Sequence, residues 1–375
     1  MADPTADPQI FQLLKDRINR YFEEAGKNRK GDAAMYTKIA IVVLVPVLGY
    51  ALLIAFGGRS LPIAFVAYLL YFLGSALFVV NIAHDASHGA ISTKKSLNKL
   101  LSFSWNIVGI SKYLWEIKHH HSHHIYTNIP HEDVDIAESP LLRFSASYPY
   151  KNYYRFQHIY AIPLYGLFGI FIVFVKDFVL LYGEKMSDHG TKHLPRFFLA
   201  RMLLTKSVFL LVSFIIPLLV LPYAWWQVLI MYLVSMAVAG GMMLLVLVVP
   251  HINETATLDG TEPDIHNRNA WVLHQISCTI DSSPHSRVLG WLSGGLNTHL
   301  IHHIFPNICH IHYIPLTRIV KETLEANGIC YKQKSFGRSL VDHFKYIKAL
   351  GQPVSVVKKA VLLSWLVNFI RDVNL

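Results

Sequence analysis

The chain has 375 residues, of which 53% are hydrophobic and only 15% charged, against about 25% charged in a typical soluble domain. This composition excludes a disordered chain, a disulfide scaffold and a coiled coil, and it predicts a membrane protein. The net charge of +10 would suit nucleic acid, but the basic residues flank long apolar segments. We therefore expect a lipid bilayer surface or an anionic head group as the partner, and no nucleic acid.

The chain begins with a polar segment, residues 1–37, in which apolar residues recur at helical spacing and predict a surface helix over 11–25. Four later stretches have the length of about 20 apolar residues that crosses a bilayer. They are residues 38–56, 61–83, 203–221 and 225–249. Short turns join the first to the second and the third to the fourth. This pattern predicts an all-α integral membrane protein with two transmembrane hairpins, 38–83 and 203–249.

The distribution of Lys and Arg predicts how the two hairpins are oriented in the membrane. Arg59 is the only one of the 34 Lys and Arg residues that falls on the far side of the membrane. Both termini are therefore predicted to be cytoplasmic, together with residues 84–202 and 250–351, which would form a helical cap. Within the cap, a crossing by residues 159–182 would separate the histidine clusters described below, so we expect an interfacial or re-entrant helix there. The last segment, residues 352–375, is predicted to be an amphipathic surface helix.

The first histidine cluster, HDASH, follows the second predicted span. His84 and His88 are four residues apart, so they lie on one face of a helix and can hold one metal ion. Because the helix continues past the hydrocarbon core, this pair is expected at the cytoplasmic end of the span.

The second cluster is HHHSHH, residues 119–124. His123 and His124 are adjacent, so on a helix they point about 100° apart and can serve two different ions. Either His119 or His120 has the spacing to complete the set, and spacing alone does not choose between them.

The third cluster contains His299, His302 and His303, and His251 stands alone after the fourth span. Together the clusters hold more imidazoles than one metal site takes, without cysteine, and this predicts two ions. Nitrogen-rich coordination with an open position suits iron that handles dioxygen. The isolated histidines are expected to be ordinary polar residues; they are His131, His158, His189, His193, His266, His274, His285 and His343.

Three segments carry a family resemblance: HDASHGAIS, WEIKHHHSHHIYTN and GGLNTHLIHHIFPNICHIHY. They resemble the three histidine boxes of the membrane fatty acid desaturases, especially the bacterial linoleoyl-CoA and front-end types. The resemblance covers about residues 35–350. It implies four transmembrane helices, a cytoplasmic catalytic cap, two iron ions and dioxygen as co-substrate, with zinc as a substitute in preparations. The implied reaction inserts a double bond into a fatty acyl chain linked to CoA, a carrier protein or a lipid.

The resemblance also assigns residues. It prefers His119 to His120, which occupies a position where relatives usually have Asn. The implied metal ligands are His84, His88, His119, His123, His124, His251, His299, His302 and His303. Candidates for orienting these imidazoles are Asp85, Asn128, Asp133, Asp135, Asn253, Glu254 and Asn297. His299 replaces the Gln that is common in front-end members, which weakens any expectation about the position of the double bond.

The resemblance implies a separate electron donor, such as ferredoxin or cytochrome b5 with its reductase, because no HPGG-like segment of a fused cytochrome b5 domain occurs. A bacterial inner membrane is the favoured location, or the endoplasmic reticulum in a eukaryote. A hydroxylase on the same scaffold is the nearest alternative. A metal transporter is a remote one, because transporters hold their ligands near the bilayer midplane.

Overall fold

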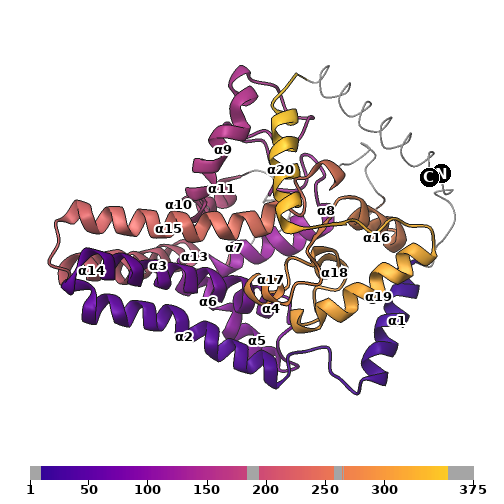
Figure 1. Cartoon of the computed structure of the whole chain (residues 1–375), viewed down its shortest axis with the longest axis horizontal. Helices are drawn as coiled ribbons and strands as arrows, with labels where there is room; N and C mark the ends of the chain where they lie inside the picture. The colour runs from indigo at the N-terminus through magenta and orange to yellow at the C-terminus, as the bar shows by residue number, and fades with distance from the viewer. Residues whose placement is uncertain (1–9, 184–193, 257–263, 265, 354–375) are drawn as a thin grey trace.

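The computed structural model describes residues 10–183, 194–256, 264 and 266–353. This part of the chain is mostly helical, with one short parallel pairing between β1 (Asp281–Ser282) and β2 (Gln333–Lys334). Long helices form one half of the molecule and shorter helices form a cap at one end of them (Figure 1). The predicted all-α membrane architecture is confirmed.

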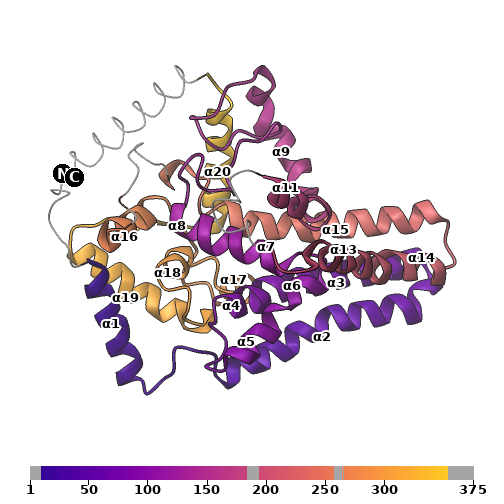
Figure 2. The same ribbon diagram turned by 180° about the vertical axis from the view of Figure 1, so that it is seen from behind.

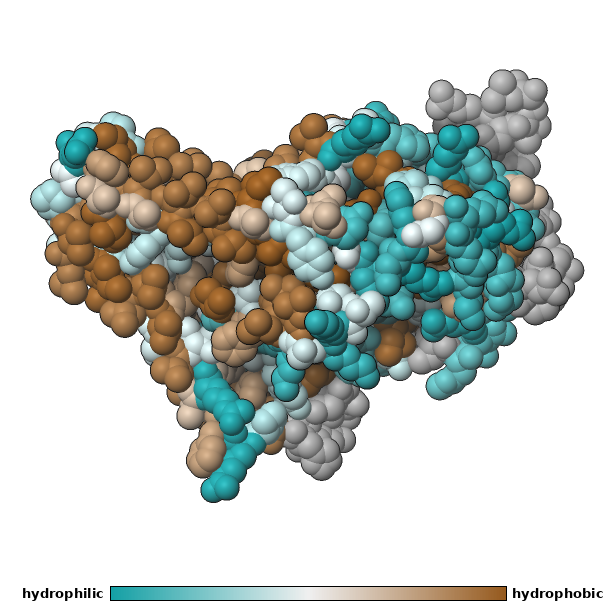
Figure 3. Space-filling view, turned by 90° about the horizontal axis from the view of Figure 1, so that it is seen from below, coloured by the Kyte–Doolittle hydropathy of each residue, from teal (hydrophilic) through white to brown (hydrophobic). Residues whose placement is uncertain are grey.

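Four helical stretches of the described chain are long and apolar enough to cross a membrane, as predicted. They cover Ala33–Arg59, Leu61–Ser87, Phe198–Val220 and Trp225–Val248. Their α-helices are α2 (Ala33–Phe56), α3 (Leu61–Phe78), α4 (His84–Ser87), α13 (Phe198–Leu210), α14 (Ile216–Val220) and α15 (Trp225–Val248). Apolar side chains cover the end of the molecule that these helices form, whereas the cap surface is mostly hydrophilic (Figure 3). The brown surface is the part that faces lipid in such an arrangement.

The first hairpin is shaped by its caps and by one close approach. Asp32 accepts hydrogen bonds from the first backbone N–H groups of α2, and Ser60 caps α3 in the same way. A Cβ on Gly74 of α3 would lie 2.5 Å from the backbone nitrogen of Pro46 in α2. The two helices therefore pack at a distance that requires glycine at this crossing.

Residues 157–182 form three short helices. They are α9 (Gln157–Gly166), α10 (Phe168–Phe174) and α11 (Lys176–Tyr182), with a 60° bend between the first two. At one end, the Gln157 side chain donates to the Ile347 carbonyl of α20 (Phe336–Leu350) at 2.5 Å. At the other end, the Asp177 carboxylate accepts a hydrogen bond from the Ser111 backbone at 2.9 Å. Both ends therefore bind segments of the cap.

The cap surrounds a second hydrophobic core. The face of α1 (Ile10–Glu24) that carries Ile10, Leu14, Ile18 and Phe22 is buried in this core, which confirms the predicted surface helix. The other cap helices are α5 (Lys95–Ser102), α6 (Ser104–Ile107), α7 (Lys112–Ile117), α8 (His124–Tyr126), α16 (Arg268–Ser277), α17 (Arg287–Leu292), α18 (His299–Ile304) and α19 (Tyr313–Ala326). From behind, α7, α8 and α18 lie between the spans and α19 (Figure 2). The predicted tail, from residue 354 onward, lies outside the described residues, as do His189 and His193.

A buried ion pair joins the third span to α11. The Lys206 ammonium of α13 donates to the Asp177 carboxylate at 2.6 Å and also to the carbonyls of Gly109 and Val173. We expect Lys206→Met to destabilise the protein by about 3–5 kcal/mol, because it leaves a buried carboxylate without its cation. The melting temperature in detergent measures the loss. Lys206→Met combined with Asp177→Asn should recover most of it, and an equal loss in both proteins would contradict this account.

Candidate metal centre

Eight of the predicted histidines form two groups, buried except for the half-buried His88, and each group has the donor atoms for a metal ion. Within each group, the candidate ligand nitrogens all lie within 4.8 Å of one another. The first group is His84, His88, His119 and His302, and the second is His123, His251, His299 and His303. The ninth, His124, joins the groups. Its Nε2 lies 3.0 Å from His119 Nε2 and 3.1 Å from His302 Nε2, and its ring stacks on His303.

A π-helical turn over Lys118–His123 explains how the second cluster serves both groups. In such a turn the backbone bonds link residues five apart, so those residues share a face. His119 and His124 are five apart and both face the first group, whereas His123 faces the second. His120 is half-buried, with its ring 4.5 Å from that of His88, and it belongs to neither group. The geometry therefore favours His119, the alternative that spacing left open.

Helix α18 bridges the two groups from the cap side. His299 and His303 are four residues apart and face the second group, while His302 faces the first. Adjacent histidines thus serve different groups in this box as well as in the second. A further π-helical turn, Val79–Ala83, precedes His84 at the end of the second span, and such turns are frequent at functional sites.

The outward Nδ1 atoms of several rings have hydrogen-bond partners that fix their orientation. Backbone carbonyls accept from His299 and His251: that of Leu296 at 3.0 Å and that of Cys278 at 3.3 Å. Side chains lie beside three others, as follows: Asp133 beside His123 (3.1 Å), Thr127 beside His303 (3.3 Å) and Tyr313 beside His302 (3.4 Å). Such partners set the tautomer that leaves Nε2 free to bind a metal.

The Nε2 atoms that face the inside of the two histidine groups show that a cation fits there. His251 donates from Nδ1 to a carbonyl, and Thr127, which uses its own hydrogen on the His123 carbonyl at 2.6 Å, accepts from His303 Nδ1. In the neutral rings both Nε2 atoms then carry lone pairs, and they lie 3.1 Å apart. In the first group, His88 Nε2 is buried without a hydrogen-bond partner. A bound metal ion would satisfy both features.

Burial keeps most of these imidazoles neutral. Burial and the neighbouring rings hold the pKa values of His119, His124, His251, His302 and His303 well below the usual value. Burial also lowers the pKa of His299, to about 3. His123 differs, because Asp133 and Asp135 outweigh the effect of burial and raise its pKa. Neutral rings are the form that binds metal, so little proton release opposes binding at neutral pH.

The candidates for orienting the imidazoles lie at different distances from the groups. Asp85 Oδ1 is 3.7 Å from His84 Nδ1, and the Asn128 side chain donates to the His251 carbonyl at 2.8 Å. Asn253 instead bonds to the Ser339 carbonyl, and Asn297 to the Ser283 carbonyl. Glu254 is exposed.

Sequence reasoning did not find the contacts of Thr127 and Tyr313 with the histidine rings. Thr127 lies in the second box, but its contact with His303 spans 176 positions of the chain. No local spacing rule links residues so far apart. Two histidines expected not to bind metal, His274 and His343, bond to the Thr127 and Ile252 carbonyls.

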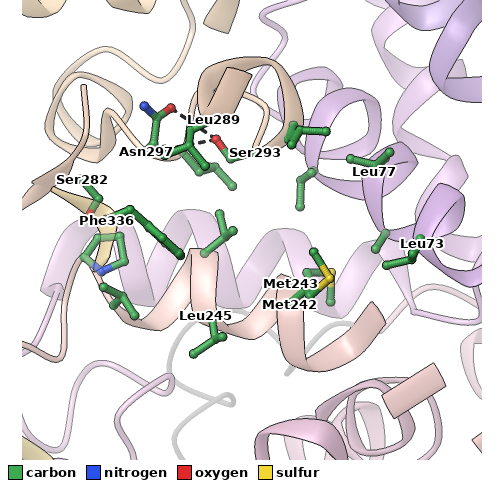
Figure 4. Close-up of a pocket in the computed structure, with 17 residues that line it drawn as sticks. Leu73, Leu77, Met242, Met243, Leu245, Ser282, Leu289, Ser293, Asn297 and Phe336 are labelled. Atoms are coloured by element: carbon green, nitrogen blue, oxygen red, sulfur yellow. Dashed lines mark hydrogen bonds between the residues drawn. The ribbon is translucent and has the colours of Figure 1, made fainter. Parts of the chain in front are cut away.

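An apolar cavity of about 350 Å³ opens beside the histidine groups. Its walls come from α3, α15, the segment around α17, and Phe336 (Figure 4). Ser293 and Asn297, which are hydrogen-bonded to each other at 3.3 Å, lie at one side of the cavity, while Leu73, Met242 and Met243 lie at another (Figure 4). The volume falls in the range of small-molecule sites.

Comparison with known proteins places these features in a family context. Residues 59–335 match the family model described as fatty acid desaturase. The sn-1 linoleoyl-lipid 6-desaturase of Synechocystis sp. is 31% identical over 91% of this chain and 95% of its own length. The enzyme of the same name from Arthrospira platensis is 29% identical, over 90% and 91%. The acyl-lipid (8-3)-desaturase of Physcomitrium patens is 25% identical, over 91% of this chain and 72% of its own length.

The neighbouring pair His119 and His120 offers a matched test of the geometry. We expect His119→Ala to lower the metal content of the purified protein, because it removes a nitrogen from the first group. His120→Ala should keep the wild-type content. Elemental analysis of iron and zinc per chain, on protein from iron-replete cells, measures both. The reverse outcome would show that the π-helical turn does not select the ligand.

Proposed function

The chain belongs to the fatty acid desaturase family, and we propose that it inserts a double bond into a fatty acyl chain carried by a membrane lipid. The observation that carries this proposal is the position of two all-histidine groups beside an apolar cavity. We assign one iron ion to each group, with His124 shared at their boundary. Zinc can take the same imidazole ligands during overexpression.

When bound, the two ions would supply the dioxygen-dependent oxidation that removes two hydrogens from an unactivated chain. The protein's own part is to position the imidazole ligands and the substrate and to exclude water. Asp133, Thr127 and the Leu296 and Cys278 carbonyls hold the imidazoles in one tautomer. The reaction takes four electrons to convert dioxygen to two waters, and the substrate supplies two. A separate electron carrier, such as ferredoxin or cytochrome b5 with its reductase, would supply the other two.

The cavity supports an acyl substrate because its walls are continuous with the histidine groups. Val80 lies four residues before His84, and Pro250 directly precedes His251. The carbonyl of Leu296, another wall residue, accepts the His299 hydrogen bond. A chain bound in the cavity would therefore lie next to the metal groups, in surroundings that exclude water. The relatives named linoleoyl-lipid and acyl-lipid desaturases support a lipid-linked substrate.

The position of the histidine groups supports a membrane enzyme rather than a transporter. The histidine groups are built from α4, α8, α18 and the turns beside them, at the cap end of the spans (Figure 1). Transporters hold their ligands near the bilayer midplane. The relatives from Synechocystis and Arthrospira support a bacterial membrane, and we propose that the cap and both termini face the cytoplasm.

Expression in cells that lack the activity tests this function. Mass spectrometry of total fatty acids should show a new unsaturated species that depends on oxygen and is absent with His302→Ala. New hydroxylated chains in place of alkenes would assign the protein to the hydroxylases. An unchanged acyl profile with altered metal uptake would favour transport.

Filling the cavity should block the substrate without touching the metal groups. We expect Ala76→Trp, in the cavity wall, to lower turnover roughly 10²-fold, the loss expected for a misplacement of about 1 Å. Val66→Trp is the matched control, because Val66 lies on the same helix and is 54% exposed. Both variants should keep the wild-type metal content. Equal activity in the two variants would show that the acyl chain does not occupy this cavity.

A further inference from the structure

A line of buried polar groups extends from the first metal group into the first span. It runs from His84 through Asp85 and His310 to Lys38, all of which are 5% exposed or less. We propose that His310 is a positioning residue for the metal centre: anchored by Lys38, it holds the Asp85 carboxylate against His84. The inference rests on the proposed metal-binding role of His84, and it adds His310 and Lys38, which the sequence analysis named neither as ligands nor as orienting residues.

The contacts on Asp85 leave it one orientation. Its Oδ2 accepts two hydrogen bonds from His310, one from the ring Nδ1 at 2.7 Å and one from the backbone N–H at 3.1 Å. Its Oδ1 faces His84 Nδ1 at 3.7 Å, and that nitrogen has no hydrogen-bond partner. The carboxylate therefore favours the His84 tautomer with hydrogen on Nδ1, which leaves Nε2 for the metal. That Nε2 points toward the first group, 3.2 Å from His119 Nε2.

Lys38 fixes the tautomer of His310 in turn. Its ammonium lies 2.7 Å from His310 Nε2, and an ammonium only donates. His310 Nε2 must therefore accept, so the ring hydrogen is on Nδ1, where it is donated to Asp85. The face of the Trp291 ring lies 5.2 Å from the same ammonium and supports its position.

The same groups have a competing interpretation as a third metal site. Donor atoms of Asp85, Cys309 and His310 lie within 4.8 Å of one another. However, Lys38 already supplies a positive charge at this position and uses the second nitrogen of His310. Asp85 is likewise engaged by the two His310 hydrogen bonds. The cluster is therefore complete without a metal, and positioning explains it better.

The network also connects three separate parts of the chain. Lys38 belongs to the first span, Asp85 lies at the end of the second, and His310 lies in the cap just after α18. In the second metal group a carboxylate also holds a histidine, but both residues belong to one cap segment: Asp133 lies 3.1 Å from His123 Nδ1. The first group is thus oriented through a contact that requires the cap to be seated on the first membrane hairpin.

Release of iron to a chelator tests the proposal on the iron-loaded, full-length protein in detergent. We expect two phases in the wild type, one per ion. His310→Ala and Lys38→Met should accelerate one phase by about 10–100-fold, the usual cost of losing such a partner, and leave the other unchanged. His310→Asn should be closer to wild type than His310→Ala, since its amide can replace the Nδ1 donor.

His312→Ala is the matched control. His312 is buried in the same segment, but its ring bonds to the Lys30 carbonyl at 3.1 Å and does not contact Asp85. Release rates for His310→Ala that equal those for His312→Ala would overturn the proposal, as would equal acceleration of both phases. If His310→Ala does not fold, the His310→Asn and Lys38→Met comparison carries the same test. A wild-type protein that binds no metal would instead refute the proposed function.

Discussion

The structure depends on nine imidazole rings that lie close together in one buried space. Each ring needs its inner nitrogen free and its outer nitrogen held, because a rotated or protonated ring cannot bind metal. The outer partners are Leu296, Cys278, Thr127, Tyr313 and the two carboxylates Asp85 and Asp133, and one of these contacts, between Thr127 and His303, joins segments 176 positions apart. The cap helices must therefore pack correctly before the inner nitrogens converge. The proposed ions would complete this arrangement rather than create it.

The spans and the boxes could be predicted because both depend on local patterns. Apolar length alone located all four spanning helices to within a few residues, and the spacing within the three clusters found the ligand candidates other than His251. The choice between His119 and His120 required the π-helical turn, which a regular helical pattern does not predict. His310 and Lys38 were missed because they reach Asp85 only after the cap folds onto the first hairpin. Asp85 and His310 are 225 positions apart in the sequence, and Lys38 and His310 are 272 apart. Contacts between residues so far apart leave no periodic signal in a single sequence.

The boundary between cap and membrane is where an apolar substrate can meet a polar metal site. The cavity walls come from α3 and α15 on the membrane side and from the segment around α17 on the cap side. Charged contacts hold this boundary from both halves: Lys206 with Asp177, and Lys38 with His310 and Asp85. Such buried ionic contacts add less to stability than to the fixed placement of elements. In this chain they hold the cap, and with it the proposed ligands, against the ends of the spans.

The central claim is that the two histidine groups form two adjacent metal sites. Anomalous X-ray diffraction at the iron absorption edge, on crystals of the iron-loaded protein, tests it most directly. The account predicts two peaks, one among His84, His88, His119 and His302 and the other among His123, His251, His299 and His303. A single peak, or a peak beside Asp85, Cys309 and His310, would contradict it.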